Sequence, residues 1–258
     1  MTTTHDVVRT AAECDGSLVR LVLARPKGNV LDAAMVGRLR ELIADATASP
    51  RVTTLMFQGE GSHFSFGASV DEHRREHVAA MLHGFHALFR ELIASSKVVL
   101  AAVRGQCLGG GLELAAFAHR VFAAPDAQLG CPEVKLGVFA PVGAIVLPWR
   151  MGQARGDALL LSGAKLAASD ALAQGLVDEI ADDPAAAAVR WHTDALQASS
   201  AVAVRHTARA ARERFHRAFV TTLDVLERQY LDELVPTHDA NEGIAAFLDK
   251  RSPVWTHR

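Results

Sequence analysis

The chain of 258 residues is predicted to fold as an α/β protein whose strands are joined by helical crossover connections. Three observations predict this class. Strand-like and helix-like segments alternate through the first half of the chain. Residues 98–103 are nearly all apolar, as in a parallel strand buried on both faces. From about Pro148 the chain becomes mainly helical. The length allows one domain with an appendage or two small domains.

The elements of the first half follow from local patterns. Residues 18–24 are strand-like, residues 32–46 have helical periodicity, and residues 52–57 are strand-like and stop at Gly59. Residues 77–94 carry an apolar stripe at helical spacing, which predicts a helix. The apolar strand at 98–103 is followed by glycines, a helix through 114–118 and a strand at 121–124. This order is typical of an α/β protein.

In the second half, residues 167–174 predict a short helix closed by Gly175, and residues 177–180 predict a strand. Residues 185–188 are alanine-rich and helical, and residues 204–234 form the strongest helical pattern. Its apolar stripe recurs at steps of three or four: Phe215, Phe219, Leu223, Leu226, Tyr230 and Leu234. Such a stripe needs a partner surface, which is either the chain's own domain or a subunit interface.

Composition excludes several classes of function. The net charge of −2 gives no drive toward nucleic acid or an anionic membrane. The cysteines, Cys14, Cys107 and Cys131, are too few and too irregular for a disulfide framework, so a cytoplasmic location is expected. Residues 1–6 are polar and predict no secretory signal. No run of about 18 apolar residues predicts a membrane span.

The segment from Gly105 to Glu113 carries the clearest chemical signal. Its triple glycine lies between the apolar strand and a helical run, where backbone N–H groups lack helical partners and the helix dipole favours negative charge. Glycine also lets a ligand approach the backbone closely. Glu113 follows in the first helical turn, and Glu133 follows a proline 20 residues later. A tight structural turn with two surface carboxylates is the alternative; together, the groups could stabilise an enolate and move protons.

Six ordered motifs resemble those of the crotonase (enoyl-CoA hydratase/isomerase) superfamily, from about residue 6 to the C-terminus. They are Arg25-Pro-Lys-Gly-Asn29-Val-Leu31 (RPxxNxL), Phe64-Ser-Phe-Gly-Ala68 (FxxGA), Gly105 to Ala115 (GxxxGGGxELA), Leu129-Gly-Cys-Pro-Glu-Val-Lys-Leu-Gly137 (FGxPExxLG), Leu161-Ser-Gly with 171–178 (LTG…A…GLV), and 242–251 (EGxxAFxxKR). The resemblance implies a crotonase (ClpP-like) fold of repeated ββα units with a C-terminal helical trimerisation region. The implied division is 1–195 for the acyl-CoA-binding core and 196–258 for oligomerisation.

The resemblance also implies roles for individual residues. The backbone N–H groups of Ala68 and Gly110 correspond to the oxyanion hole that grips a thioester carbonyl. Glu113 and Glu133 correspond to the two glutamates of the hydratases, which position a water and exchange protons with the substrate carbons. The implied activity is therefore that of a hydro-lyase acting on an acyl-CoA, which is its substrate and not a separate cofactor.

Further residues are implied in binding CoA and in assembly. Arg25 and Lys27 are placed to meet CoA phosphates, although the interpretation that they are ordinary surface charges is nearly as good. Phe66 is assigned to CoA binding as well. Phe247 and Lys250 match C-terminal positions that often reach a neighbour's CoA site. A homotrimer, or a hexamer made of two trimers, is expected. We expect no metal, because the histidines show no ligand spacing such as HExxH.

Two departures from the family pattern bear on the substrate. Ser69 replaces the usual aspartate after the oxyanion loop, and Val142 replaces a glycine, so a reshaped acyl pocket is expected. Residues 64–73 and 135–142 resemble cyclohexa-1,5-diene-1-carbonyl-CoA hydratases, which add water to a cyclic dienoyl-CoA. A general 2-enoyl-CoA hydratase, another crotonase chemistry such as isomerisation, C–C hydrolysis or decarboxylation, and a CoA- or RNA-binding protein without catalysis are the alternatives. Cys131 is interpreted as a small buried filler in preference to a pocket residue.

Overall fold

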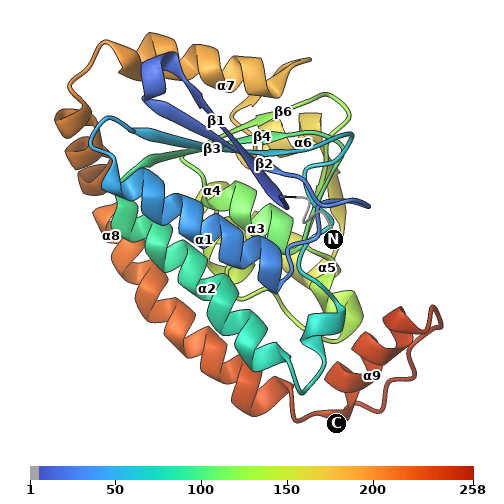
Figure 1. Ribbon diagram of the computed structural model, residues 1–258. Coiled ribbons are helices and arrows are strands. Elements are labelled where there is room, and N and C mark those ends of the chain that lie inside the picture. Colours follow the sequence, from blue (N-terminus) through green and yellow to red (C-terminus); the bar gives the residue numbers. More distant parts are fainter. Residues whose placement is uncertain (1–5) are drawn as a thin grey trace, which may run out of the picture.

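The computed structural model describes residues 6–258 (Figure 1). The polar N-terminal segment that predicts no secretory signal lies almost entirely outside the described residues. A six-stranded sheet has the order β1-β2-β3-β4-β6-β9 and is parallel except for the antiparallel pair β1–β2. The strands are β1 (Val8–Glu13), β2 (Leu18–Leu23), β3 (Thr54–Gly59), β4 (Val98–Val103), β6 (Arg120–Ala123) and β9 (Glu179–Ile180). The predicted α/β class and the buried parallel strand at 98–103 are confirmed.

A second layer of short strands lies beyond this sheet. Strands β5 (Gln106–Leu108), β7 (Gln128–Gly130) and β8 (Lys165–Ala167) form a three-stranded sheet in the order β5-β7-β8. Single bridges continue the layer, from Leu31 to Ala68 and from Ser65 to Cys107. Strands β2, β3, β4 and β6 of the main sheet therefore each lead into a short second-layer segment and then into a helix or helical turn. This is the repeated ββα arrangement of the crotonase fold that the resemblance implies.

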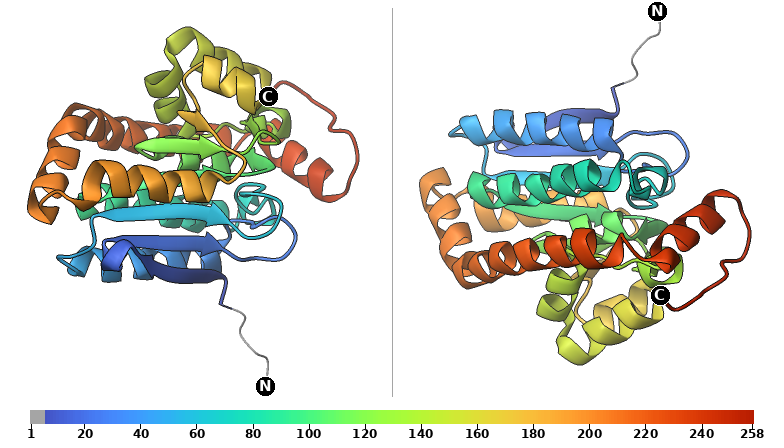
Figure 2. Two further views of the ribbon diagram at one scale, coloured as in Figure 1. Left: turned by 90° about the horizontal axis from the view of Figure 1, so that it is seen from above. Right: turned by 90° about the horizontal axis from the view of Figure 1, so that it is seen from below.

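Helices cover both faces of the main sheet (Figures 1 and 2). Helices α1 (Ala33–Ala48), α2 (Val78–Ser95) and α8 (Ala201–Arg228) lie side by side on one face, and α7 (Pro184–His192) covers the other. The strands divide their side chains between these layers with the expected period of two. Phe57 and Ala101 join the larger core, whereas Met56 and Leu100 pack toward α7.

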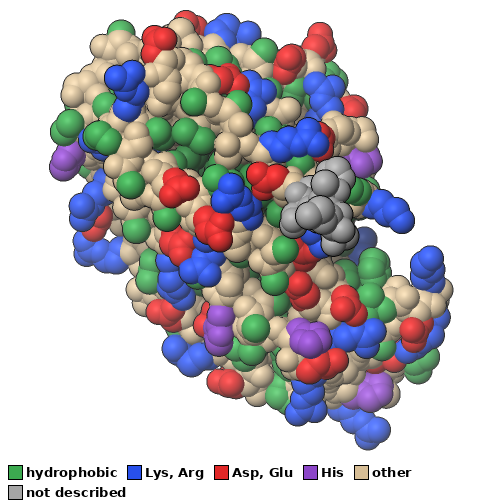
Figure 3. Space-filling model, in the orientation of Figure 1, with side chains coloured by type: hydrophobic (Ala, Val, Ile, Leu, Met, Phe, Trp, Pro, Cys, Tyr) green, Lys and Arg blue, Asp and Glu red, His purple; other side chains and the backbone are tan. Residues whose placement is uncertain are grey.

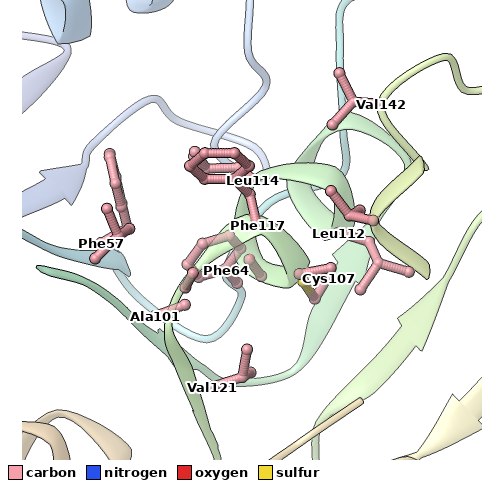
Figure 4. Packing of buried hydrophobic residues seen from close by; sticks show 14 of the residues in the cluster. Phe57, Phe64, Ala101, Cys107, Leu112, Leu114, Phe117, Val121 and Val142 are labelled. Atoms are coloured by element: carbon pink, nitrogen blue, oxygen red, sulfur yellow. The ribbon is translucent and has the colours of Figure 1, made fainter. Parts of the chain in front are cut away.

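The centre of the larger core surrounds α3 (Gly110–Phe117) (Figure 4). Leu112, Leu114 and Phe117 project from this helix among Phe57 and Phe64, and every residue of the helix is buried. Apart from Glu113, the helix carries only glycines and apolar side chains, which is typical of a fully buried position. The start of α3, where the candidate site lies, is therefore held within the larger core.

Helix α8 packs its apolar stripe on its own chain. The Phe219 ring lies 5.4 Å from that of Phe117 and 5.9 Å from that of Phe89, measured between centroids. Arg212 donates to the carbonyls of Phe117 and Ala118 at 2.6 and 2.7 Å, which satisfies the C-terminal end of α3. Of the two interpretations of the stripe, packing within the chain is the one observed. The C-terminal segment thus holds the helix that begins at the candidate site.

The sequence-based boundaries were wrong in places. Strands β1, β5, β7 and β8 were not predicted, and the helical region begins at Gly143, before Pro148. It contains α4 (Gly143–Met151), α5 (Gln153–Ser162), α6 (Ala168–Ala173) and α9 (His238–Leu248). Shorter turns are a 3-10 turn at Pro132–Leu136 and π-helical turns at Thr193–Gln197 and Gln229–Leu234. Strands β5, β7 and β8 have three residues each, which is too few to show a period. Strand β1 has six residues, but Val8 is its only buried one, so it has no apolar alternation.

The described surface has mixed charge. On the face drawn in Figure 3, basic and acidic side chains are interspersed, and neither sign forms a continuous field. This agrees with the net charge of −2. Within residues 6–258, no helix combines the length and the apolar character that a membrane span requires.

Candidate active site

One small cavity brings the predicted catalytic residues together. It has a volume of about 60 Å³ and is lined by Phe66, Ala68, Gly110, Glu113 and Glu133. These residues lie where second-layer segments end: Ala68 at its bridge to Leu31, Gly110 just beyond β5, and Glu133 just beyond β7. The carboxyl ends of neighbouring second-layer strands therefore converge on one site, as is usual for ligand sites in α/β folds.

Two backbone N–H groups face this cavity without protein partners. Gly110 is the first residue of α3, so its N–H has no acceptor within the helix. Within the described part of the chain, neither this N–H nor that of Ala68 donates a hydrogen bond to the protein. A methyl group added at Gly110 would lie 3.1 Å from the Ala68 nitrogen, so the two backbones are adjacent. Two adjacent, unpartnered N–H groups are the donors from which an oxyanion hole can be built.

A local hydrogen-bond network holds the loop that carries Ala68. The buried Asn29 amide donates to the carbonyls of Glu60, His63 and Phe64 at 3.0, 2.9 and 3.2 Å. The Ser65 hydroxyl donates to the Asn29 carbonyl at 2.8 Å and accepts from the Gly67 N–H at 3.0 Å. Neighbouring donors are thereby satisfied, and the Ala68 N–H is left for a ligand.

Glu133 is seated on the backbone at the start of α3. Gly109 has φ +50° and ψ −126°, a conformation that favours glycine, and its N–H donates to the Gly130 carbonyl at 2.9 Å. A methyl group at Gly109 would collide with Oε1 of Glu133. The other oxygen of that carboxyl group, Oε2, is buried without a hydrogen-bond partner among residues 6–258. The absence of a side chain at Gly109 therefore creates the space in which the Glu133 carboxyl group lies.

Glu113 is the second carboxyl group of the cavity and is only 4% exposed. It lies in the first turn of α3, as predicted, and its Oε1 accepts a hydrogen bond from the Gly143 N–H at 2.7 Å. Gly143 begins α4, so the amino end of a second helix also faces this carboxyl group. The group is held in one orientation but remains beside the cavity.

The electrostatic setting favours one proton shared by the two carboxyl groups. Burial raises the pKa of Glu113 above the usual carboxyl range, the neighbouring charge of Glu133 raises it further, and the hydrogen bond from Gly143 opposes the shift. Burial also raises the pKa of Glu133. Two nearby carboxylates in a water-poor site resist joint ionisation, so the pair titrates as a unit. Such a pair can hold an acid and a base together near neutral pH.

The rest of the cavity wall is largely apolar, and part of it comes from segments 64–73 and 135–142, on which the resemblance to the cyclic dienoyl-CoA hydratases rests. It is formed by Val70, His73, Met81, Leu82, Phe85, Leu136, Val138, Phe139 and Tyr230, together with Pro132, Ala140 and Pro141. The Tyr230 hydroxyl is buried and has no partner among the described residues. A usable signal existed, because Tyr230 is the chain's only tyrosine and stands in a stripe of phenylalanine and leucine.

The predicted CoA-binding residues are not all at this cavity. Phe66 lies on its rim, 44% exposed, with its ring centroid 5.0 Å from that of His63. Arg25 and Lys27 line a separate shallow pocket. That pocket is adjacent, because the Phe66 N–H donates to the Gly28 carbonyl at 2.8 Å. Arg25 also forms an ion pair with Asp32.

The C-terminal residues assigned to CoA lie apart from the cavity of their own chain. Phe247 is 52% exposed at the end of α9, and Lys250 is exposed just beyond it. Neither residue lines the cavity. Helix α9 does contact the 3-10 turn that carries Glu133, because Gly243 lies close against the Leu136 carbonyl.

The two departures from the family pattern do not line the cavity. The Val142 side chain is fully buried in the large core (Figure 4), and Ser69 is absent from the cavity wall. Neither side chain touches the cavity directly, and the expectation of a reshaped acyl pocket stays a prediction. Cys131 is buried in the core, 1% exposed, and lies outside the cavity wall, as expected for a filler. Among residues 6–258, no cluster of three or more histidine, cysteine, aspartate or glutamate residues is placed to hold a metal.

Comparison with known proteins places the chain in a family. The model of the enoyl-CoA hydratase/isomerase family matches residues 13–258, and the chain belongs to this family. A cyclohexa-1,5-dienecarbonyl-CoA hydratase of Thauera aromatica is 48% identical over 246 residues, which cover 95% of this chain and 95% of that protein. The 2,3-dehydroadipyl-CoA hydratase of Escherichia coli (strain K12) is 31% identical over 247 residues, covering 92% of this chain and 94% of that protein.

A solved structure supports the same assignment. The crystal structure of an enoyl-CoA hydratase from Mycobacterium avium subsp. paratuberculosis K-10 has a TM-score of 0.83 to this chain at 25% identity, covering 97% of this chain and 98% of that one. The crotonase fold implied by the sequence motifs is thereby confirmed. The family membership makes this chain an enzyme of the enoyl-CoA hydratase type.

Proposed function

We propose that this chain adds water to an enoyl-type CoA thioester, and that its substrate is cyclohexa-1,5-diene-1-carbonyl-CoA. The observation that carries the hydration is that one cavity brings two unpartnered N–H groups together with the buried Glu113 and the half-buried Glu133, whose Oε2 is itself buried. The cyclic substrate is proposed from the 48% identity to the Thauera aromatica hydratase over nearly the whole chain.

In the proposed mechanism, the thioester oxygen accepts hydrogen bonds from Ala68 and Gly110. These donors stabilise the negative charge that develops as the carbonyl becomes an enolate, and each such donor is typically worth about 10²–10³ in rate. The donors belong to the folded backbone and need no rearrangement when the charge forms. Polarisation of the carbonyl makes the conjugated carbon open to attack by water.

The carboxyl pair then handles two protons. Water adds its oxygen to the conjugated carbon and gives one proton to the ionised carboxylate, while the protonated carboxyl group gives its proton to a carbon of the enolate. The substrate gains one water molecule, and the pair, Glu113 and Glu133, again holds one proton. The raised pKa values support this role, because they keep one group protonated near neutral pH. All added atoms come from water, so the proposed reaction uses no further cofactor.

For binding of the CoA portion, we propose Phe66, Arg25 and Lys27. Phe66 connects the cavity rim to the pocket that holds the two cations. Phosphates would lie near Lys27, whereas Arg25 already shares its charge with Asp32. Phosphate contacts of this kind stabilise mainly through charge.

We further propose that the chain acts in the cytoplasm as a homotrimer or as a hexamer of two trimers, with residues 196–258 contributing the contacts and 1–195 forming the catalytic core. The exposed position of Phe247 and Lys250, away from their own cavity, supports a contribution to a neighbour's CoA site. Sedimentation velocity on the protein with and without residues 247–258 tests this assembly. A monomeric full-length protein would contradict it.

The substrate is tested by turnover of cyclohexa-1,5-diene-1-carbonyl-CoA beside crotonyl-CoA, with products identified by mass. We expect both to gain one water and the cyclic diene to react faster. Faster turnover of crotonyl-CoA would instead establish a general 2-enoyl-CoA hydratase. A shifted double bond without a gain in mass would establish an isomerase on the same fold.

A further inference from the structure

Tyr230 brings a hydroxyl group to the cavity from the C-terminal part of the chain. It lies in the π-helical turn Gln229–Leu234 that extends α8, and its ring centroid is 5.2 Å from that of Phe139. Its neighbours in the surrounding cluster are apolar and come from α2, α9 and the segment around Val138. The residue lines the same cavity as Glu113 and Glu133.

The hydroxyl is unexplained by the fold alone. Tyr230 is 1% exposed, and its oxygen has no hydrogen-bond partner among residues 6–258. Leaving a buried hydroxyl unpaired is destabilising, and phenylalanine would avoid that cost at this position. Oε2 of Glu133, in the same cavity, is also buried and unpartnered. The cavity therefore offers one free O–H donor and one free carboxyl oxygen to whatever enters it.

The Tyr230 hydroxyl and Oε2 of Glu133 can both bind the same ligand atom, the oxygen of the water that adds to the substrate. The thioester oxygen already has two donors, Ala68 and Gly110. The water that adds has two hydrogens, which the carboxyl groups can accept, and two lone pairs. One lone pair attacks the substrate carbon, and the other needs a donor. A phenol that stays protonated supplies one, and burial together with the charges of Glu133 and Glu113 raises the pKa of Tyr230.

We propose that the Tyr230 hydroxyl donates a hydrogen bond to the oxygen that adds to the substrate, first as water and then as the product hydroxyl. The assignment rests on the proposed hydration. Tyr230 would act as a catalytic residue that turns the attacking lone pair toward the conjugated carbon. The C-terminal helix would then take part in the chemistry, in addition to supporting α3.

The test is Tyr230→Phe, which keeps the ring and its packing on Phe139 and removes only the hydroxyl. We expect kcat to fall about 10- to 100-fold, the effect of one hydrogen bond made to a reacting atom. Affinity for butyryl-CoA, a saturated thioester that cannot be hydrated, should change less than about twofold, because the oxyanion donors and CoA contacts remain.

Ile244→Val is the matched packing control. Ile244 belongs to the same buried cluster as Tyr230 but does not line the cavity. This variant should lower the melting temperature slightly and keep its kcat. Comparison of the two variants distinguishes the effect of looser packing in the cluster from the effect of losing the Tyr230 hydroxyl.

Three results would decide the matter. A fall in the kcat of Tyr230→Phe with unchanged butyryl-CoA affinity supports the proposal. Unchanged kcat overturns it, and so does a parallel loss of turnover and butyryl-CoA affinity, which would mark a structural role. Wild-type protein is assayed first: failure of the wild type to hydrate any enoyl thioester refutes the proposed function itself, whereas failure of the variant to differ refutes only the role of Tyr230.

Discussion

Replacement of Gly109 by alanine tests how the backbone seats the Glu133 carboxyl group. The added methyl would overlap Oε1 of Glu133, so one of the two must move. The residue also has φ +50° and ψ −126°, outside the regions that alanine prefers. The perturbation therefore acts twice, by straining the turn before α3 and by displacing a carboxyl group from the cavity.

The two effects have separate magnitudes. Holding a non-glycine residue in such a conformation costs about 1–3 kcal/mol of stability. Displacing Glu133 would remove the proposed general acid or base, and such a group is worth about 10²–10⁴ in rate. We therefore expect a folded Gly109→Ala protein with a modestly lower melting temperature and kcat at least about 100-fold below the wild type.

Gly152→Ala is the matched control. Gly152 also has a positive φ, +82°, but a methyl group there would meet no atom within 4 Å, and the residue lines neither the cavity nor the pocket of Arg25 and Lys27. Comparable destabilisation without loss of turnover is expected for the control. The assay is steady-state hydration of the cyclic dienoyl-CoA, with stability measured by thermal unfolding. A Gly109→Ala enzyme with near-normal kcat would refute the seating of Glu133 on Gly109.

Three further predictions follow from the site and its support. Glu133→Gln should lower kcat by at least about 100-fold in the hydration assay while the melting temperature is retained, and near-normal turnover would sink the two-glutamate mechanism. The raised pKa of Glu113 means that the folded state holds a proton that the unfolded state releases, so wild-type stability should fall as the pH rises from the ordinary glutamate range through the raised pKa. Glu113→Gln can still accept the hydrogen bond from Gly143 and should remove much of that decline in stability. In urea unfolding at pH 8, the variant should be more stable than the wild type by at least about 1.4 kcal/mol, the equivalent of one pKa unit. An unchanged slope of stability against pH would contradict the shared proton. Arg212→Gln should lose about 1–3 kcal/mol of stability, because the Phe117 carbonyl loses this donor while Ala118 keeps its hydrogen bond from Arg150. Arg205→Gln, which removes one exposed hydrogen bond to Pro50, should lose under about 1 kcal/mol in the same unfolding assay; equal losses would argue against the role of Arg212.

Long periodic segments made most of the fold predictable from the sequence. The helix predicted at 77–94 is observed as α2, Val78–Ser95, and the strand predicted at 98–103 coincides with β4. Their patterns suffice because each buries a stripe or a whole strand. Strands β5 and β7 have three residues each, which is too short for a period. The second layer that positions the site was therefore accessible only through the family resemblance.

Residues of the candidate site could be predicted where a reactive side chain stands in a recognisable local sequence pattern. Glu113 at a helix start and Glu133 after a proline could be singled out from the chain, whereas their meeting depends on β5 pairing with β7. Tyr230 could not be placed, because nearly 100 residues separate it from Glu133 and its spacing is that of a core residue. The sequence also could not show that the Val142 side chain turns into the core, although its backbone lies at the start of α4 near the site.

The most direct test of the central claim is hydration of cyclohexa-1,5-diene-1-carbonyl-CoA in ¹⁸O-labelled water. We predict that the wild-type product gains one labelled hydroxyl group, with the thioester intact. Glu113→Gln and Glu133→Gln should incorporate label at least about 100-fold more slowly. Label found only in a released carboxylate would reveal thioester hydrolysis, and a product without label would reveal isomerisation or no reaction. Either result would contradict the assignment of the two glutamates to the addition of water.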